Sequence, residues 1–159
     1  MITPPPRGWL ADEVQAPALV DLLAWYNATR GEKPVLPVAA LPALAKLPGG
    51  DDLALIEIEP YGGYRYRSMG EAYKTLASLV PDGDDVTRES RAVIRQHLDL
   101  ASREGHPFHI SITRWDGPNI LQYDRLILPL DDGHGAITHL LVGEAFLRYA
   151  RGGPEDEQE

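Results

Sequence analysis

A group of aromatic and polar side chains has the residue types and the spacing of a binding site for a small molecule. Its members are Tyr64, Tyr66, Ser68, Tyr73 and His97. Tyr64 and Tyr66 alternate with arginines, so a strand that buries the tyrosines would leave the arginines in solvent. The phenol rings could pack around an apolar or aromatic ligand, and their hydroxyls could fix its orientation. Plain packing in a hydrophobic core is the alternative for the same tyrosines.

His97 is the most informative single member of this group, because it lies on the apolar stripe of a long helical segment. A neutral imidazole can ligate iron. A partly buried histidine that donates to a carbonyl is the alternative. The remaining histidines have no spacing that specifies a metal site; they are His106, His109, His134 and His139. We therefore assign no cofactor and expect no metal.

Catalytic motifs are missing from the sequence. It contains no cysteine, no G-x-S-x-G elbow, no P-loop lysine and no dinucleotide fingerprint. Glu57 and Glu59 would share one face of a strand and could act as acid and base. The alternative, which the sequence favours, is that this face of the strand is exposed to solvent. The sequence therefore predicts that the protein is not an enzyme.

Length and charge restrict the partners. The chain has 159 residues, about the size of one domain. Fifteen basic and 24 acidic residues give a net charge of −9, and four of the acids lie in the last five residues. Scattered Lys and Arg argue against nucleic acid and against an anionic membrane surface. No apolar run approaches the ~18–20 residues of a membrane span, and the N-terminus does not resemble a secretory signal, so we expect a cytoplasmic protein.

Hydrophobic periodicity predicts an α+β fold. Leu19, Leu22, Leu23 and Tyr26 have helical spacing within 14–30, and Gly31 would end that helix. The expected strands are 53–59, 64–69, 108–114, 120–130 and 137–143, and the expected later helices are 71–79, 86–104 and a short one within 143–150. Turns within each group of strands imply antiparallel pairing. The organisation predicted is an N-terminal arm and helix (1–34), a domain (35–150) and a disordered acidic tail (151–159).

Two local motifs resemble a family of small stand-alone bacterial PAS-domain proteins. They are the run Tyr64-Arg65-Tyr66-Arg67-Ser68-Met69-Gly70 and the run Asp124-Arg125-Leu126-Ile127-Leu128-Pro129-Leu130-Asp131-Asp132-Gly133, and Gly105-His106-Pro107 also fits. The resemblance implies a PAS-like five-stranded antiparallel sheet, with helices on one face plus an N-terminal helix. It places His97 where haem-binding PAS sensors carry their iron ligand. It also implies that the N-terminal helix mediates a homodimer, for which packing on the outer sheet face is the alternative.

The function expected is that of a cytoplasmic PAS-type sensor or regulatory adaptor in signal transduction. It would bind a small apolar or aromatic ligand through the tyrosine and histidine group, and signal through a partner protein or the dimer. One alternative is a small cone-type α+β enzyme with a pocket carboxylate as base. The other is a ligand-free protein-interaction module.

Overall fold

The computed structural model describes residues 14, 16–73, 85–116 and 119–151. Its helices are α1 (Pro17–Arg30) and α3 (Asp85–Glu104), and its strands are β1 (Leu36–Pro37), β2 (Leu53–Ile58), β3 (Tyr64–Met69), β4 (Phe108–Asp116), β5 (Asn119–Asp131) and β6 (Ile137–Arg151). Three short 3-10 turns lie between β1 and β2, at Val38–Ala40, Leu44–Lys46 and Gly50–Asp52. The α+β class is confirmed.

The strands form one open, mixed sheet of six strands in the order β1-β5-β6-β2-β3, with β4 also paired to β5. Five of them pair antiparallel, as expected, and β2 and β3 form the expected hairpin. The expectation of a purely antiparallel five-stranded sheet is wrong, because β1 adds a parallel strand beside Leu130 and Asp131. β4 ends its pairing at Ile127, so β1 takes the stretch of the β5 edge that β4 leaves open. Pro37, which has no N–H, is compatible with an edge position.

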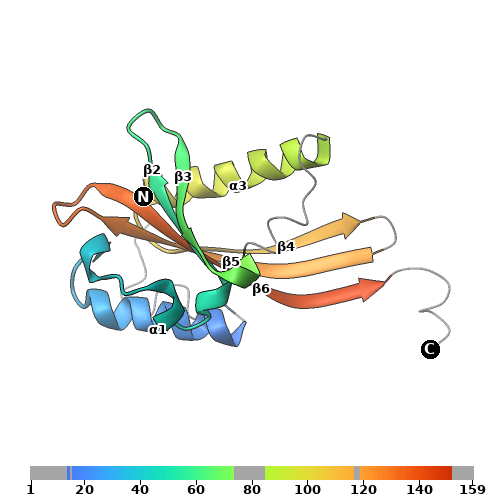
Figure 1. Cartoon of the computed structure of the whole chain (residues 1–159), viewed down its shortest axis with the longest axis horizontal. Helices are drawn as coiled ribbons and strands as arrows, with labels where there is room; N and C mark the ends of the chain where they lie inside the picture. Colours follow the sequence, from blue (N-terminus) through green and yellow to red (C-terminus); the bar gives the residue numbers. More distant parts are fainter. Residues whose placement is uncertain (1–13, 15, 74–84, 117–118, 152–159) are drawn as a thin grey trace.

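The two helices lie on opposite sides of this sheet (Figure 1). We call the face toward α3 the inner face and the face toward α1 the outer face. Each face has its own hydrophobic core, with Leu53, Leu128 and Leu141 on the outer side and Ile56 and Ile127 among those on the inner side. The central strands therefore bury side chains on both faces, which is why β5 reads as a nearly continuous apolar run.

α1 forms and packs as its sequence pattern predicts. Pro17 occupies the first turn, where the missing N–H costs nothing, and Gly31 ends the helix with a φ of 58°. Its apolar stripe is buried on the outer face. Gly143 of β6 permits a close approach, since a Cβ there would lie 2.7 Å from Leu19 Cδ2. In the structure α1 packs on the outer face of the sheet, which is the alternative to its use as a dimer helix.

The chain beyond β3 agrees with the sequence in part. α3 matches the expected long helix, and Gly105, with a φ of 71°, follows its end. Residues 71–73 are helical; the rest of the expected helix 71–79, the arm 1–13 and the tail from 152 lie outside the described residues. The short helix expected within 143–150 is wrong. That segment continues β6 to Arg151, because it pairs along β5 as far as Asn119, and sheet pairing overrides local helix propensity.

Among the described residues, no helix combines the length and the apolar character needed to cross a membrane.

Candidate functional site

Four polar side chains meet on the inner face, beneath α3. We call them the inner-face polar group; they are Tyr73, His97, Arg125 and Glu144. Arg125 on β5 lies directly opposite Glu144 on β6, and its Nε donates to Glu144 Oε1 at 2.7 Å. Arg125 Nη1 donates to His97 Nδ1 of α3 at 3.0 Å. These residues are only 3–7% exposed, so the group links α3 to two central strands within the protein interior.

The geometry around His97 fixes its chemical form. A guanidinium can only donate, so Nδ1 of His97 must be the unprotonated acceptor and Nε2 carries the proton of the neutral ring. Burial lowers the pKa of the imidazole, and the adjacent Arg125 charge lowers it further. A histidine that ligates iron through Nε2 usually donates from Nδ1 to a second group. The donor arrangement at His97 is the opposite, and therefore does not favour a haem ligand.

Tyr73 adds a phenol to the group and connects it to Tyr66. Their rings meet edge to face with centroids 6.0 Å apart, and their hydroxyl oxygens lie 3.5 Å apart. Burial raises the pKa of Tyr73 well above its ordinary value of 10, and the nearby Glu144 charge raises it further. Tyr73 is therefore a neutral phenol that can donate a hydrogen bond. Tyr66 is 46% exposed, which corrects the expectation that alternation along β3 buries it.

Tyr64 lies on the same face of the sheet but reaches a different part of α3. Its hydroxyl donates to the Asp99 carboxylate, and its ring is half-buried. Burial raises the pKa of this phenol, and the hydrogen bond to Asp99 raises it further. Tyr64 thus fastens the edge strand to α3 and stands beside, not within, the inner-face polar group.

Ser68 does not join the other predicted residues. Ile56 lies opposite Tyr66, but its neighbour Leu55 lies opposite Ser68, so β3 contains one extra residue at this point. Such a bulge reverses the alternation that follows it. Ser68 consequently shares the outer face with Leu55, while Met69 returns to the inner core. The expectation that Ser68 points toward α3 is wrong, and burial of Met69 is the physical reason.

Two members of the inner-face polar group were not among the predicted residues. Arg125 stands in the motif that resembles the PAS family, and its position on the inner face follows only from the register of β5. Glu144 falls within the segment expected to be helical. Once β6 extends to Arg151, Glu144 follows Leu140 and Val142 at period two, and therefore lies on the same inner face of the sheet as they do. Opposite charges facing each other on two central strands were the signal that could have identified the pair.

A second polar cluster lies on the outer face, at the start of α1, around the buried side chain of Asp124. We call it the outer-face polar group; it consists of Asp124, Ser111 and His109. Ser111 Oγ donates to Asp124 Oδ1 at 2.7 Å, and His109 Nε2 lies 3.2 Å from the same oxygen. The other oxygen, Oδ2, accepts from the backbone N–H of Ala16 at 3.3 Å. Asp124 is fully buried. The serine bonds to the carboxylate and not to the histidine, so this is an anchor for α1 and not the arrangement of a nucleophilic triad.

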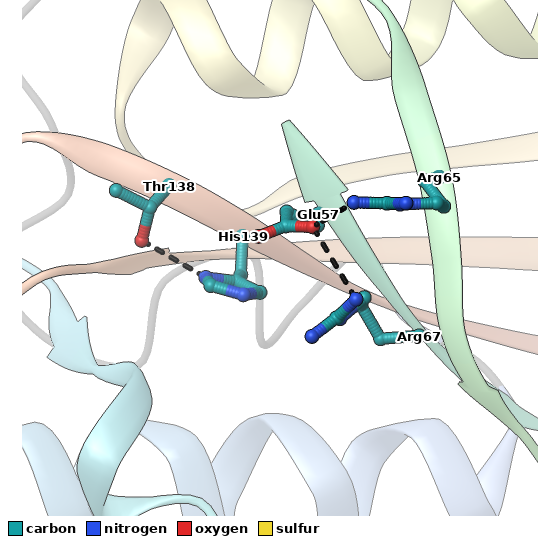
Figure 2. Close-up of polar contacts among 5 residues, drawn as sticks. All are labelled: Glu57, Arg65, Arg67, Thr138 and His139. Atoms are coloured by element: carbon teal, nitrogen blue, oxygen red, sulfur yellow. Dashed lines mark hydrogen bonds and ion pairs between the residues drawn. The ribbon is translucent and has the colours of Figure 1, made fainter. Parts of the chain in front are cut away.

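Figure 2 shows a third, more exposed cluster on the outer face, where Glu57 lies between two arginines of β3. Glu57 Oε1 is 3.3 Å from Arg65 and 3.7 Å from Arg67. Beside them on β6, His139 Nδ1 lies 2.9 Å from the Thr138 hydroxyl. The arginine side chains are more than half exposed, so each pair contributes about 0–1 kcal/mol. Glu57 therefore serves surface ion pairs, which does not suit the acid or base considered from the sequence.

Within the ranges that the structure describes, no group of three or more His, Asp or Glu side chains is placed to hold a metal ion.

Comparison with known proteins gives no identity. No protein-family model matches the chain, and no curated protein matches it significantly.

Proposed function

We propose that this chain is a cytoplasmic PAS-type regulatory module that binds a small aromatic molecule next to the inner-face polar group. It would act through a partner protein or a second copy of itself. The observation that carries the proposal is the order of its antiparallel strands, β3-β2-β6-β5-β4, with α3 crossing from β3 to β4 over the inner face. In the architecture that the sequence resembles, ligands bind between that sheet face and the crossing helix.

The residues beneath α3 suggest the class of ligand. Tyr66 and Tyr73 offer the edge and the face of two aromatic rings, and aromatic rings pair favourably in such arrangements. The neutral Tyr73 phenol can donate to a carbonyl or carboxylate oxygen on the ligand. Arg125 and Glu144 already satisfy each other, so an aromatic ring with one acceptor fits better than a multiply charged molecule.

A ligand-free interaction module is the second candidate. It is favoured by the exposure of Tyr66 and by the mutual hydrogen bonding of Glu144, Arg125 and His97. The enzyme alternative has less support, because the buried Glu144 carboxylate on the inner face already accepts a hydrogen bond from Arg125. The expected homodimer stays a proposal, and α1 supports it less than its sequence indicates, since its apolar stripe packs on the outer sheet face.

Native mass spectrometry of the protein purified without denaturation tests the sensor proposal. We expect a mass excess from a retained small molecule, or from benzoate or 4-hydroxybenzoate added in excess. Substitution of Tyr73 by Leu should raise the dissociation constant for the added acid, obtained by titration, about tenfold, the effect of losing roughly 1.4 kcal/mol of binding free energy. Tyr61→Leu is the matched control, because Tyr61 is 97% exposed on the β2–β3 turn. If the wild-type protein carries no adduct and binds neither acid, the sensor proposal fails and the interaction module stands.

A further inference from the structure

Asp124 and Arg125 are consecutive residues of β5, yet they belong to different buried groups. Side chains alternate across a strand, so Asp124 points to the outer face and Arg125 to the inner face. Asp124 is 0% and Arg125 6% exposed. Most buried positions of β5 carry apolar side chains that tolerate small shifts, whereas these two carry opposite charges held by hydrogen bonds.

Each of the two charges holds an element that is distant in sequence. On the outer face, Asp124 accepts from the Ala16 N–H at the start of α1 and from Ser111 of β4. On the inner face, Arg125 donates to His97 of α3 and to Glu144 of β6. Hydrogen bonds weaken steeply as their length and angle depart from the optimum. A displacement of β5 that accommodates a change on the inner face must therefore disturb the hydrogen bond from the Ala16 N–H to Asp124, which anchors the start of α1.

The sheet is irregular at this point, which allows local movement. The pairing of β5 with β6 shifts register between Gln122 and Tyr123, immediately before Asp124. A bulge interrupts the ladder and permits a strand to bend there. Asp124 and Arg125 both belong to the regular pairing that runs from Tyr123 to Leu130, so they can shift together relative to the chain that precedes Tyr123.

We infer that Asp124 and Arg125 couple the inner-face polar group to the start of α1, so that a change in the hydrogen bonds of that polar group loosens or tightens the N-terminal end of α1 on the opposite face. The coupling is a property of the fold. Only the stimulus that drives it, a ligand beneath α3, rests on the proposed function.

Amide hydrogen exchange in the ligand-free protein tests the coupling in one direction. Glu144→Gln removes a charge from the inner face with little change of size. We expect the Ala16 amide to exchange about tenfold faster in this variant, within the ~5–150-fold range of typical coupling between sites. The Leu19 and Val20 amides, which donate to Ala16 O, should follow. The control is Leu98→Ala, which perturbs the inner core and should leave the Ala16 amide unchanged under native conditions.

Coupling is reciprocal, so a change on the outer face must reach His97. Ser111→Ala removes one hydrogen bond to Asp124 at an exposed position of β4, and we expect it to shift the ring ¹⁵N resonances of His97. Thr29→Ala, at an exposed position near the end of α1, is the control and should not shift them. The Ser111 variant keeps the test valid if Glu144→Gln fails to fold. Unchanged His97 resonances in Ser111→Ala, or equal acceleration of the Ala16 amide in Leu98→Ala, would overturn the coupling and leave the ligand proposal unaffected.

Discussion

Replacement of Arg125 by methionine is expected to lower the free energy of unfolding by about 3–5 kcal/mol, because it leaves Glu144 as an uncompensated charge in the interior. Glu144 is 7% exposed and accepts from Arg125 Nε at 2.7 Å. His97 would lose the donor to its Nδ1 in the same variant. Urea denaturation of the wild type and the variant at pH 7.5 measures the difference.

The double variant Arg125→Met/Glu144→Leu is the control for this prediction. With both charges removed, no ion remains to be desolvated, and replacement of a buried ion pair by apolar residues is often neutral or stabilising. We therefore expect the double variant to recover most of the stability lost by Arg125→Met. A single variant that loses less than about 1 kcal/mol, the range of an exposed pair, would contradict the buried pairing of these strands.

Substitution of Tyr26 by alanine is expected to cost about 3–5 kcal/mol, as for other large aromatic residues in a core. Tyr26 is fully buried between α1 and the outer sheet face, and its hydroxyl donates to Pro129 O at 2.7 Å. Burial raises the pKa of this phenol above its ordinary value, so the ring stays neutral at every pH at which the protein would be studied.

Tyr66→Ala is the matched comparison, because it removes the same side chain from a position that is 46% exposed. We expect a loss of about 1 kcal/mol, mainly from the edge-to-face contact with Tyr73. Thermal or urea denaturation of both variants gives the two values. Equal losses for Tyr26→Ala and Tyr66→Ala would show that the Tyr66 side chain is buried, as strict alternation predicts, and would contradict its exposure in the structure.

Local sequence patterns were sufficient for most elements of the fold. Helical spacing located α1 and α3, and period-two alternation located β2 to β4. An apolar run located β5, whose side chains are buried on both faces of the sheet. The failures have long-range causes. β6 continues through Glu144 because β5 offers it hydrogen-bonding partners, and β1 exists because β4 stops short along β5. In both cases the pairing partner lies elsewhere in the chain, so the local sequence of β6 or of β1 does not reveal it.

The candidate site was predictable only where simple alternation held. Tyr73 and His97 lie beneath or on α3 as the pattern predicts, and Tyr64 faces the same helix. Ser68 lies on the other face because one extra residue in β3 reverses the alternation. Arg125 and Glu144 were missed because a buried ion pair is recognised by the register of two strands, and each residue alone resembles an ordinary surface charge.

The protonation of His97 tests the inner-face polar group most directly, and the proposed ligand would bind next to that group. A pH titration of the His97 ring followed by long-range ¹H–¹⁵N correlation spectra would report both nitrogen atoms. The hydrogen bond from Arg125 predicts an unprotonated, accepting Nδ1 and a protonated Nε2 at pH 7.5. Burial and the Arg125 charge predict a pKa below the ordinary value of 6.5. A proton on Nδ1 at neutral pH, or a pKa above 6.5, would contradict the arrangement of Glu144, Arg125 and His97 described here.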